Sequence, residues 1–160
     1  AKNCITDCQQ DPVETADINV TGTVNVFEAA DRAKVKKVIY AESSAVYEGI
    51  EKLPSAEDSI APQSFYGISK AGQIHASKVM AKEWASYGIR VNVVAPGLTR
   101  TGFSEFLWGN PDILNMATSM TPISRIAEPD EMVGAVLYFA SKASSFVTGQ
   151  VLPVDGGMTI

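Results

Sequence analysis

Two kinds of hydrophobic pattern alternate along the chain, one with the spacing of a helix and one with the continuity of a buried strand. Residues 17–33 carry apolar side chains at helical intervals, at Val24, Phe27, Ala30 and Ala33. Residues 64–87 predict a long helix that ends at Gly88, the residue type favoured just after a helix C-terminus. A third helix is expected over residues 129–141, with Pro129 in its first turn.

Short runs rich in β-branched residues separate the helical segments. They cover residues 38–41, 89–95 and 151–154, and each has the length and composition of a strand buried in a parallel sheet. Pro96-Gly97 ends the second run, and Asp155-Gly156-Gly157 ends the third. Because strands and helices alternate with short connections, the sequence predicts right-handed βαβ units and an α/β fold with helices on both faces of the sheet.

Two further segments are expected to be irregular. Residues 48–63 are rich in glycine, proline, aspartate and serine, and predict a loop. Residues 99–124 have no steady period, because Trp108, Gly109 and Pro111 interrupt it, and we interpret them as a mobile lid over a substrate. The apolar side chains of this lid suit a small hydrophobic substrate, although they could equally be core residues. They are Phe103, Phe106, Leu107 and Trp108.

Composition narrows the class of protein. The 160 residues, of which 46% are hydrophobic, are enough for one globular domain. The net charge of −5 argues against nucleic acid or an anionic membrane as the main partner. No apolar run approaches the roughly 20 residues of a membrane helix. We therefore expect a cytoplasmic protein with no membrane partner.

The cysteines and the histidine exclude some kinds of site. Cys4 and Cys8 are the only cysteines and His75 is the only histidine, which is a poor donor set for a metal. We expect no metal and no disulfide, and interpret the cysteines as free thiols near a loose N-terminus. With one imidazole in mid-helix, Ser-His-Asp and zinc-hydrolase chemistry are not expected.

Tyr66 and Lys70 form the candidate chemical centre. Four residues apart on the helix predicted over 64–87, they lie one above the other on the same face. The ammonium of Lys70 can then favour the ionised phenol of Tyr66. A tyrosine held in this way can give or take a proton near neutral pH. The same spacing is also common on solvated helix faces, so this pair alone does not decide the function.

Longer motifs accompany this pair. The motifs NVTGTVNV (19–26) and VIYAESSAVY (38–47) resemble the extended branch of the short-chain dehydrogenase/reductase (SDR) superfamily, which holds nucleotide-sugar epimerases and dehydratases. The motif RVNVVAPG (90–97) and the ending VTGQV to DGG (147–157) resemble its compact single-domain reductases. We therefore interpret residues 1–160 as one partial domain.

Within that domain the resemblance changes partway along the chain. Residues 1–70 are similar to the extended branch and residues 71–160 to the compact branch. The seam lies near residues 69–75.

The resemblance implies a role for each of four catalytic residues. Tyr66 matches the catalytic acid/base of the family, and Lys70 matches the lysine that lowers the pKa of that tyrosine. Ser43 falls where a hydroxyl polarises the substrate oxygen, and Asn19 matches the asparagine of a water-linked proton relay. Each residue also has a structural alternative, since Ser43 could cap a turn and Asn19 could begin a helix.

The resemblance also implies an NAD or NADP cofactor. Lys70 matches the lysine that hydrogen-bonds the nicotinamide ribose, and Pro96, Gly97 and Thr101 match the segment that contacts the nicotinamide carboxamide. Pro96-Gly97 could instead only end a strand. None of the glycines forms the family's G-x-x-x-G-x-G turn or the G-x-G-x-x-G form, so cofactor binding by this chain alone is in doubt.

The expected fold is thus the C-terminal half of a Rossmann-like doubly wound parallel sheet, without its first strands and glycine-rich turn. The strand near residues 38–43 would then expose an apolar edge that can pair with another chain. The helices 17–33 and 64–87 match a subunit contact of SDR dimers. We therefore expect a homo-oligomer or an association through these surfaces.

Three functions remain open. The first is an NAD(P)-dependent oxidoreductase acting on a small-molecule carbonyl or secondary alcohol, completed by another chain or by further residues. The second is a self-associating SDR remnant without cofactor binding or chemistry. The third is a fragment of a nucleotide-sugar epimerase or dehydratase.

Overall fold

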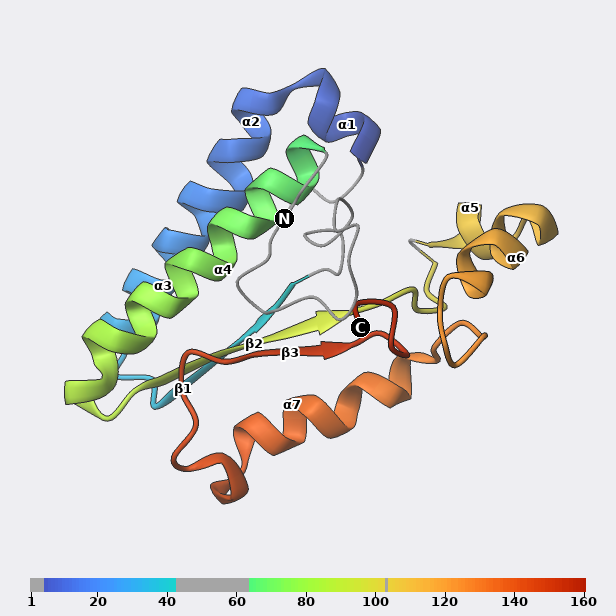
Figure 1. The fold of residues 1–160 in the computed structure, drawn as a ribbon. Coiled ribbons are helices and arrows are strands. Elements are labelled where there is room, and N and C mark those ends of the chain that lie inside the picture. The colour runs from blue at the N-terminus through green and yellow to red at the C-terminus, as the bar shows by residue number, and fades with distance from the viewer. Residues whose placement is uncertain (1–4, 43–63, 103) are drawn as a thin grey trace.

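Three parallel strands form the sheet at the centre of the molecule (Figure 1). The computed structural model describes residues 5–42, 64–102 and 104–160. The strands are β1 (Lys37–Ala41), β2 (Arg90–Pro96) and β3 (Val151–Val154), in the order β1-β2-β3. The three predicted strands are therefore confirmed. β2 is central, and its side chains from position 91 to 95 are all buried, as expected for a strand covered on both faces.

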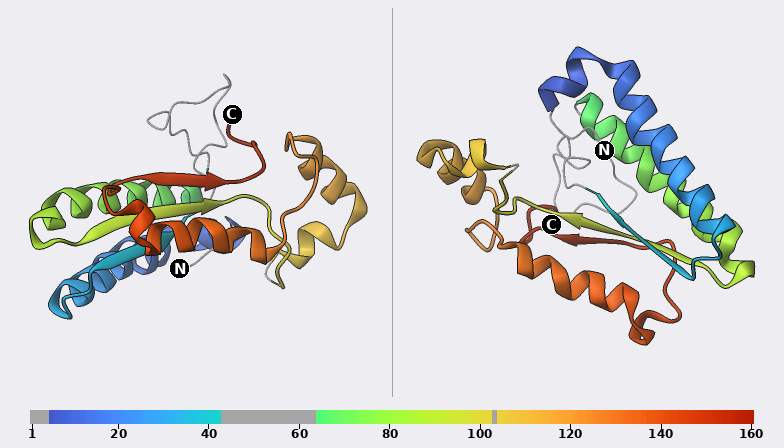
Figure 2. Two further views of the ribbon diagram at one scale, coloured as in Figure 1. Left: turned by 90° about the horizontal axis from the view of Figure 1, so that it is seen from below. Right: turned by 180° about the vertical axis from the view of Figure 1, so that it is seen from behind.

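Helices cover both faces of this sheet. α3 (Gly22–Arg32) and α4 (Phe65–Trp84) lie on one face, and α7 (Val133–Ala140) lies on the other (Figures 1 and 2). The chain runs from β1 through α4 to β2, and from β2 through α7 to β3, so both strand pairs are parallel. This arrangement confirms the predicted α/β fold. Within the described residues β1 pairs only with β2, which leaves its other edge without a strand partner there.

The N-terminal segment is helical and packed, where we expected it to be loose. α1 (Ile5–Gln10), α2 (Pro12–Ala16) and a π-helical turn, η1 (Asp17–Thr21), lead directly into α3. Cys8 is completely buried on α1, and its carbonyl accepts a hydrogen bond from Thr15 Oγ1 at 3.4 Å. The prediction failed because helices of five or six residues are too short to display a hydrophobic period. Cys4 lies outside the described residues.

The predicted helix over residues 64–87 is confirmed. Ser64 is its cap, with an extended backbone and a side-chain oxygen that accepts a hydrogen bond from the Gly67 N–H at 3.1 Å. A last 3₁₀ turn, η3 (Ala85–Tyr87), follows α4 and ends at Gly88, whose φ of +71° lies in the left-handed region. The buried side chains of α4 recur every three or four residues, so one face of the helix packs on the sheet.

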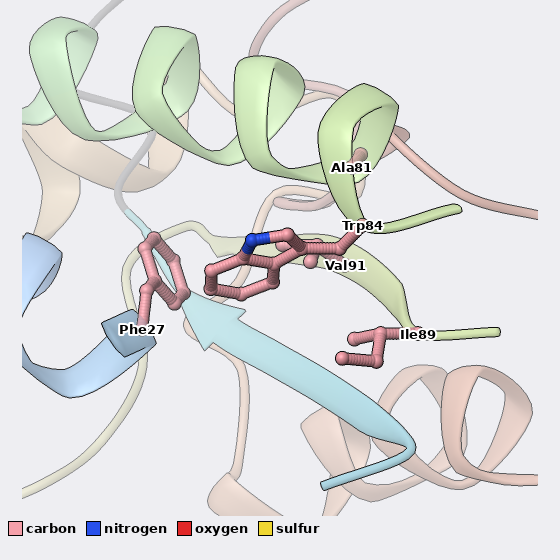
Figure 3. Packing of buried hydrophobic residues seen from close by; sticks show 5 residues of the cluster. All are labelled: Phe27, Ala81, Trp84, Ile89 and Val91. Atoms are coloured by element: carbon pink, nitrogen blue, oxygen red, sulfur yellow. The ribbon is translucent and has the colours of Figure 1, made fainter. Parts of the chain in front are cut away.

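Aromatic and aliphatic side chains fill the space between this helix layer and the sheet. Phe27, Ala81, Trp84, Ile89 and Val91 form one buried cluster (Figure 3). The rings of Phe27 and Trp84 meet edge to face, with their centres 5.9 Å apart. The cluster joins α3, α4 and β2, and so fixes the position of α4 relative to the strands.

The segment over residues 99–124 contains two helices, which corrects the prediction that it is irregular. They are α5 (Glu105–Trp108) and α6 (Pro111–Ser119). Asn110 caps α6, because its side-chain oxygen accepts hydrogen bonds from the N–H groups of Asp112 and Ile113. We had interpreted Pro111 as an interruption, but at the first position of a helix proline is favoured.

The helix predicted over residues 129–141 is confirmed, with a 3₁₀ first turn. The turn η4 (Pro129–Met132) leads into α7, and a short 3₁₀ helix, η5 (Lys142–Ser144), follows. No helix in the described ranges is both long and apolar enough to cross a membrane. The loop predicted over residues 48–63 lies outside the described residues.

Candidate active site

Helix α4 brings Tyr66 and Lys70 together. The Lys70 Nζ atom lies 5.8 Å from the centre of the Tyr66 ring, within the range of a cation–π contact. Lys70 is 5% exposed, and Tyr66 is half-buried. A positive charge at this distance in a water-poor site favours the phenolate form of a tyrosine. The helical spacing therefore yields the juxtaposition that the sequence predicted.

A buried carboxylate pairs with the same lysine. The Glu42 Oε1 atom lies 3.5 Å from the Lys70 Nζ atom, and Glu42 is 6% exposed. Glu42 follows β1 directly and precedes Ser43, the candidate for the substrate hydroxyl. Sequence reasoning missed Glu42, although a charged residue at the end of an apolar strand is a usable signal. Ser43 itself lies outside the described residues.

Asn19 reaches the site from the π-helical turn η1. It is completely buried, and its Nδ2 group donates a hydrogen bond to Ser69 Oγ at 2.9 Å. Ser69 in turn donates to the backbone oxygen of Tyr66 at 2.8 Å. Asn19 thus contacts the turn of α4 that carries both Tyr66 and Lys70, although 50 residues separate it from Ser69.

A second polar side chain of α4, that of Gln73, holds the backbone of the π-helical turn η1. Gln73 Nε2 donates to the backbone oxygen of Asn19 and to Thr23 Oγ1, the latter at 2.8 Å. Thr23 donates to the same Asn19 oxygen at 2.6 Å. A π-helical turn often marks a functional position because it leaves the regular backbone ladder. Here the buried carbonyl of Asn19 receives two side-chain donors, which stabilises η1 against α4.

Tyr40, on strand β1, borders the site on the side of the sheet. The Lys70 Nζ atom lies 5.6 Å from the centre of its ring, and the Tyr40 hydroxyl is hydrogen-bonded to Thr23 Oγ1 at 3.3 Å. Burial raises the pKa of Tyr40, the hydrogen bond from Thr23 offsets part of that shift, and the negative charge of Glu42 raises the pKa further. Tyr40 is therefore held as a neutral phenol.

The candidate nicotinamide contacts lie where β2 ends. Pro96 is the last residue of β2, and the Gly97 N–H donates to the Val154 carbonyl of β3 at 3.0 Å. A Cβ atom on Gly97 would lie 2.6 Å from the Asp155 Cα atom, so only glycine fits beside that backbone. The carboxyl ends of parallel strands are the usual position for ligands in such sheets.

Thr101 lies in the exposed segment that follows β2. Its N–H donates to Ser104 Oγ at 3.1 Å, and its carbonyl accepts from Trp108 Nε1 at 3.0 Å. The guanidinium carbon of Arg100 lies 5.2 Å from the centre of the Trp108 ring. Phe106, 64% exposed, projects from the same lid segment, and Phe103 lies outside the described residues.

A hollow of about 180 Å³ borders the end of β2 and β3, next to the candidate nicotinamide contacts. Val154 and Asp155, which adjoin Gly97, line it together with Leu98 and Ile123. Its lining includes neither Tyr66 nor Lys70, so this candidate pair lies outside it. In the described parts of the chain no three His, Cys, Asp or Glu side chains gather as metal ligands would.

Comparisons with known proteins identify the family of this chain. A family model described as enoyl-(acyl carrier protein) reductase matches residues 2–159. The NADH-dependent L-xylulose reductase of Ambrosiozyma monospora is 37% identical over 160 residues, which cover 95% of this chain and 57% of that protein.

Two solved structures share the fold. A short-chain type dehydrogenase/reductase from Mycobacterium marinum is 36% identical with a TM-score of 0.73, covering 90% of this chain and 54% of that one. A gluconate 5-dehydrogenase from Burkholderia cenocepacia J2315, in complex with NADP and tartrate, is 34% identical with a TM-score of 0.74. The match covers 89% of this chain and 53% of the gluconate enzyme.

The chain therefore spans about half the length of the relatives it matches. Because the family model extends over nearly all 160 residues, and these relatives agree with it in sequence and fold, the chain belongs to the short-chain dehydrogenase/reductase superfamily.

Proposed function

We propose that this chain carries the proton-transfer centre of an NAD(P)-dependent oxidoreductase that interconverts a secondary alcohol and a carbonyl group. One observation carries the proposal. Tyr66 and Lys70 share a buried helix face, and Asn19, from a distant segment, hydrogen-bonds the same turn through Ser69. A solvated helix face would have no reason to bury the lysine or to hold a second polar element against it.

Each of the four candidate catalytic residues has a defined task in this reaction. When bound, the nicotinamide gives or accepts the hydride at the carbinol carbon. Tyr66 moves the proton of the substrate oxygen, so that no charged alkoxide persists. Lys70 stabilises the tyrosine anion, Ser43 polarises the substrate oxygen, and Asn19 supports the relay that returns the proton to solvent.

The residues present fit one end of the dinucleotide. Lys70 offers a buried ammonium for the ribose hydroxyls, and the turn at Pro96 and Gly97 lies at the carboxyl end of the central strand, with Thr101 beyond it. The glycines of this sequence form neither of the phosphate-binding motifs of the family. We propose that Lys70, Pro96, Gly97 and Thr101 hold the nicotinamide end and that a second subunit or further residues complete the phosphate site.

The substrate class follows from the relatives. One is named for the reduction of L-xylulose and another for the oxidation of gluconate, so both act on small polyhydroxylated molecules. We propose a sugar, polyol or sugar acid of this size for the present chain. This replaces the small hydrophobic substrate suggested by the lid, because Phe106 and Met116 are largely exposed rather than gathered into an apolar pocket.

Exchange of the catalytic tyrosine tests the proposal. We expect Tyr66→Phe to lower turnover by roughly 100-fold or more, since a positioned acid/base contributes about that much. The measurement is the change in NAD(P)H absorbance with L-xylulose, or with gluconate and the oxidised nucleotides. Tyr87→Phe is the matched control, because Tyr87 is 65% exposed at the far end of the same helix. Equal turnover in Tyr66→Phe and Tyr87→Phe would reject Tyr66 as the acid/base.

We also propose that the chain self-associates through α3 and α4. Val26 on α3 and Phe65, Ile68 and Val79 on α4 are each about half exposed or more. Light scattering at micromolar concentration should give at least twice the mass of 17.1 kDa, and Val26→Glu should reduce it. Met116→Glu, on the outlying α6 with an equal exposed fraction of 63%, should leave the mass unchanged. A single monomeric species would defeat this proposal.

The same exposed faces favour the second candidate, a self-associating module without chemistry. That candidate predicts oligomers together with no nucleotide binding. A nucleotide-sugar epimerase or dehydratase fragment ranks third. It depends on the resemblance of residues 1–70 to the extended branch, which stays a prediction, as does the seam near residues 69–75.

A further inference from the structure

The ion pair between Glu42 and Lys70 has no part in the roles given above. Its two side chains are almost completely enclosed, at 0% and 6% exposure, with 3.5 Å between Oε1 and Nζ. Removing two charges from water is costly, and the attraction between the paired charges offsets only part of that cost. A pair retained at that cost, next to the candidate acid/base, calls for a functional explanation.

The surroundings of Lys70 place its charge between two tyrosines and one carboxylate. Its Nζ atom lies 5.6 Å from the Tyr40 ring centre and 5.8 Å from the Tyr66 ring centre. In the described ranges these three titratable groups, Glu42 and Tyr40 at β1 and Tyr66 on α4, face the ammonium. Each of the three becomes less stable as an anion when another of them is charged.

We infer that Glu42 is a positioning residue that anchors Lys70 and offsets its charge. The carboxylate holds the ammonium at the end of β1. The negative charge of Glu42 then offsets part of the effect of the lysine charge on the Tyr66 phenol, so Tyr66 stays protonated to a higher pH than it would beside an unpaired lysine. In this state Tyr66 is a proton donor, which favours reduction of a carbonyl over oxidation of an alcohol at neutral pH.

Ionisation of Tyr66 can be measured without any substrate. The chain has five tyrosines, and the absorbance of tyrosinate near 295 nm, compared with that of Tyr66→Phe in the same background, isolates the contribution of Tyr66. We expect Glu42→Gln to lower the midpoint of this ionisation by about one pH unit or more. Glu42→Asp, which keeps the charge, should restore much of the wild-type midpoint. Glu83→Gln, at an exposed position of α4, should not move it. An unchanged or raised midpoint in Glu42→Gln would overturn the inference.

A second variant keeps the test decisive if Glu42→Gln fails to fold. The double variant Glu42→Gln/Lys70→Met removes both charges of the buried pair, and neutral replacements of such pairs are often tolerated. Because Glu42 offsets much of the effect of Lys70, we expect the ionisation midpoint of Tyr66 in the double variant to lie less than about one pH unit above that of wild type. A midpoint more than one unit above wild type would show that Lys70 acts on Tyr66 uncompensated, and would overturn the inference.

The inference rests on the proposed function only in treating Tyr66 as the acid/base. The absorbance titration needs neither nucleotide nor turnover, so its failure is distinct from failure to bind NAD(P). Where turnover is measurable, the pH at which alcohol oxidation becomes half-maximal should fall in Glu42→Gln by the same shift as the Tyr66 midpoint.

Discussion

The residues around Tyr66 are held by polar contacts as much as by apolar packing. Asn19, Thr23 and Gln73 are all buried, and their hydrogen bonds tie η1 to α4. Buried polar groups of this kind are costly when they lose a partner, so the network favours one geometry. The geometry of the candidate site therefore depends on side chains beyond Tyr66 and Lys70.

Substitution of Gly97 tests how closely the residues that follow β2 and β3 pack together, next to the candidate nicotinamide contacts. Gly97→Ala would place a methyl group 2.6 Å from the Asp155 Cα atom, and backbone must move to make room. We expect a loss of about 2 kcal/mol in the free energy of unfolding, measured by urea denaturation.

Gly134→Ala is the matched control for this substitution. Gly134 lies within α7 with nothing near its added Cβ, so alanine should stabilise the protein by about 0.5–1 kcal/mol. If Gly97→Ala were as stable as Gly134→Ala, this result would contradict the close contact between Gly97 and the Asp155 backbone.

Among single residues, those in motifs could be predicted and those in the buried network could not. Tyr66 and Lys70 follow from helical spacing together with the family resemblance, and Asn19 from the resemblance. Glu42 and Gln73 were missed because their partners are distant in sequence: 28 residues separate Glu42 from Lys70, and 54 separate Gln73 from Asn19. Only the folded arrangement of α4, η1 and β1 shows that these side chains meet.

At the scale of elements, the start of α7 depends on a reciprocal cap. The Glu131 side chain accepts the Glu128 N–H at 2.8 Å and two hydrogen bonds from Arg125, at 2.6 and 2.7 Å. The Arg125 hydrogen bonds, followed by the Glu128 backbone, lower the pKa of Glu131 from 4.5 to about 2. Since the pKa is lower in the folded state, this carboxylate stabilises the protein above 4.5, and that contribution is lost as the pH falls through about 2.

Glu131→Gln should therefore change the acid sensitivity of the fold. We expect its Tm to lie slightly below wild type at pH 7, because the cap and ion pair are exposed and each is weak. Between about pH 5 and pH 2 its Tm should fall less than that of wild type. Thermal melts followed by circular dichroism measure both, with Glu83→Gln as an exposed carboxylate control. Parallel Tm curves for Glu131→Gln and wild type would contradict this role.

Elements with a long, regular pattern were predicted, and short or capped elements were not. The apolar runs of β1, β2 and β3 and the long period of α4 are strong signals, because burial on a sheet imposes them. α6 was missed because Pro111 was taken as a breaker, although Asn110 before it is a favourable cap. The π-helical turn η1 has no local sequence signal, since its geometry depends on Gln73 and Thr23 bonding the Asn19 carbonyl.

At the scale of the molecule, the arrangement of strands explains where the candidate site lies. The parallel order β1-β2-β3 brings the end of β1, with Glu42, and the end of β2, with Gly97, to the same edge of the sheet. The family resemblance predicted this α/β arrangement, and the structure confirms it. The sequence predicted association through the helices 17–33 and 64–87, but not which of their side chains stay exposed, because the exposed fraction of Val26 or Ile68 depends on what packs over it.

Binding of NADH and NADPH to the 160-residue protein tests the central claim most directly. If a second subunit completes the phosphate site, titration followed by nucleotide fluorescence should show saturable binding of at least one nucleotide in the micromolar range. Lys70→Met should weaken it by roughly tenfold, the equivalent of one charged hydrogen bond, and Lys82→Met, exposed on the same helix, should leave it unchanged. Absence of saturable binding of either nucleotide up to millimolar concentration would contradict a working NAD(P) site in this chain.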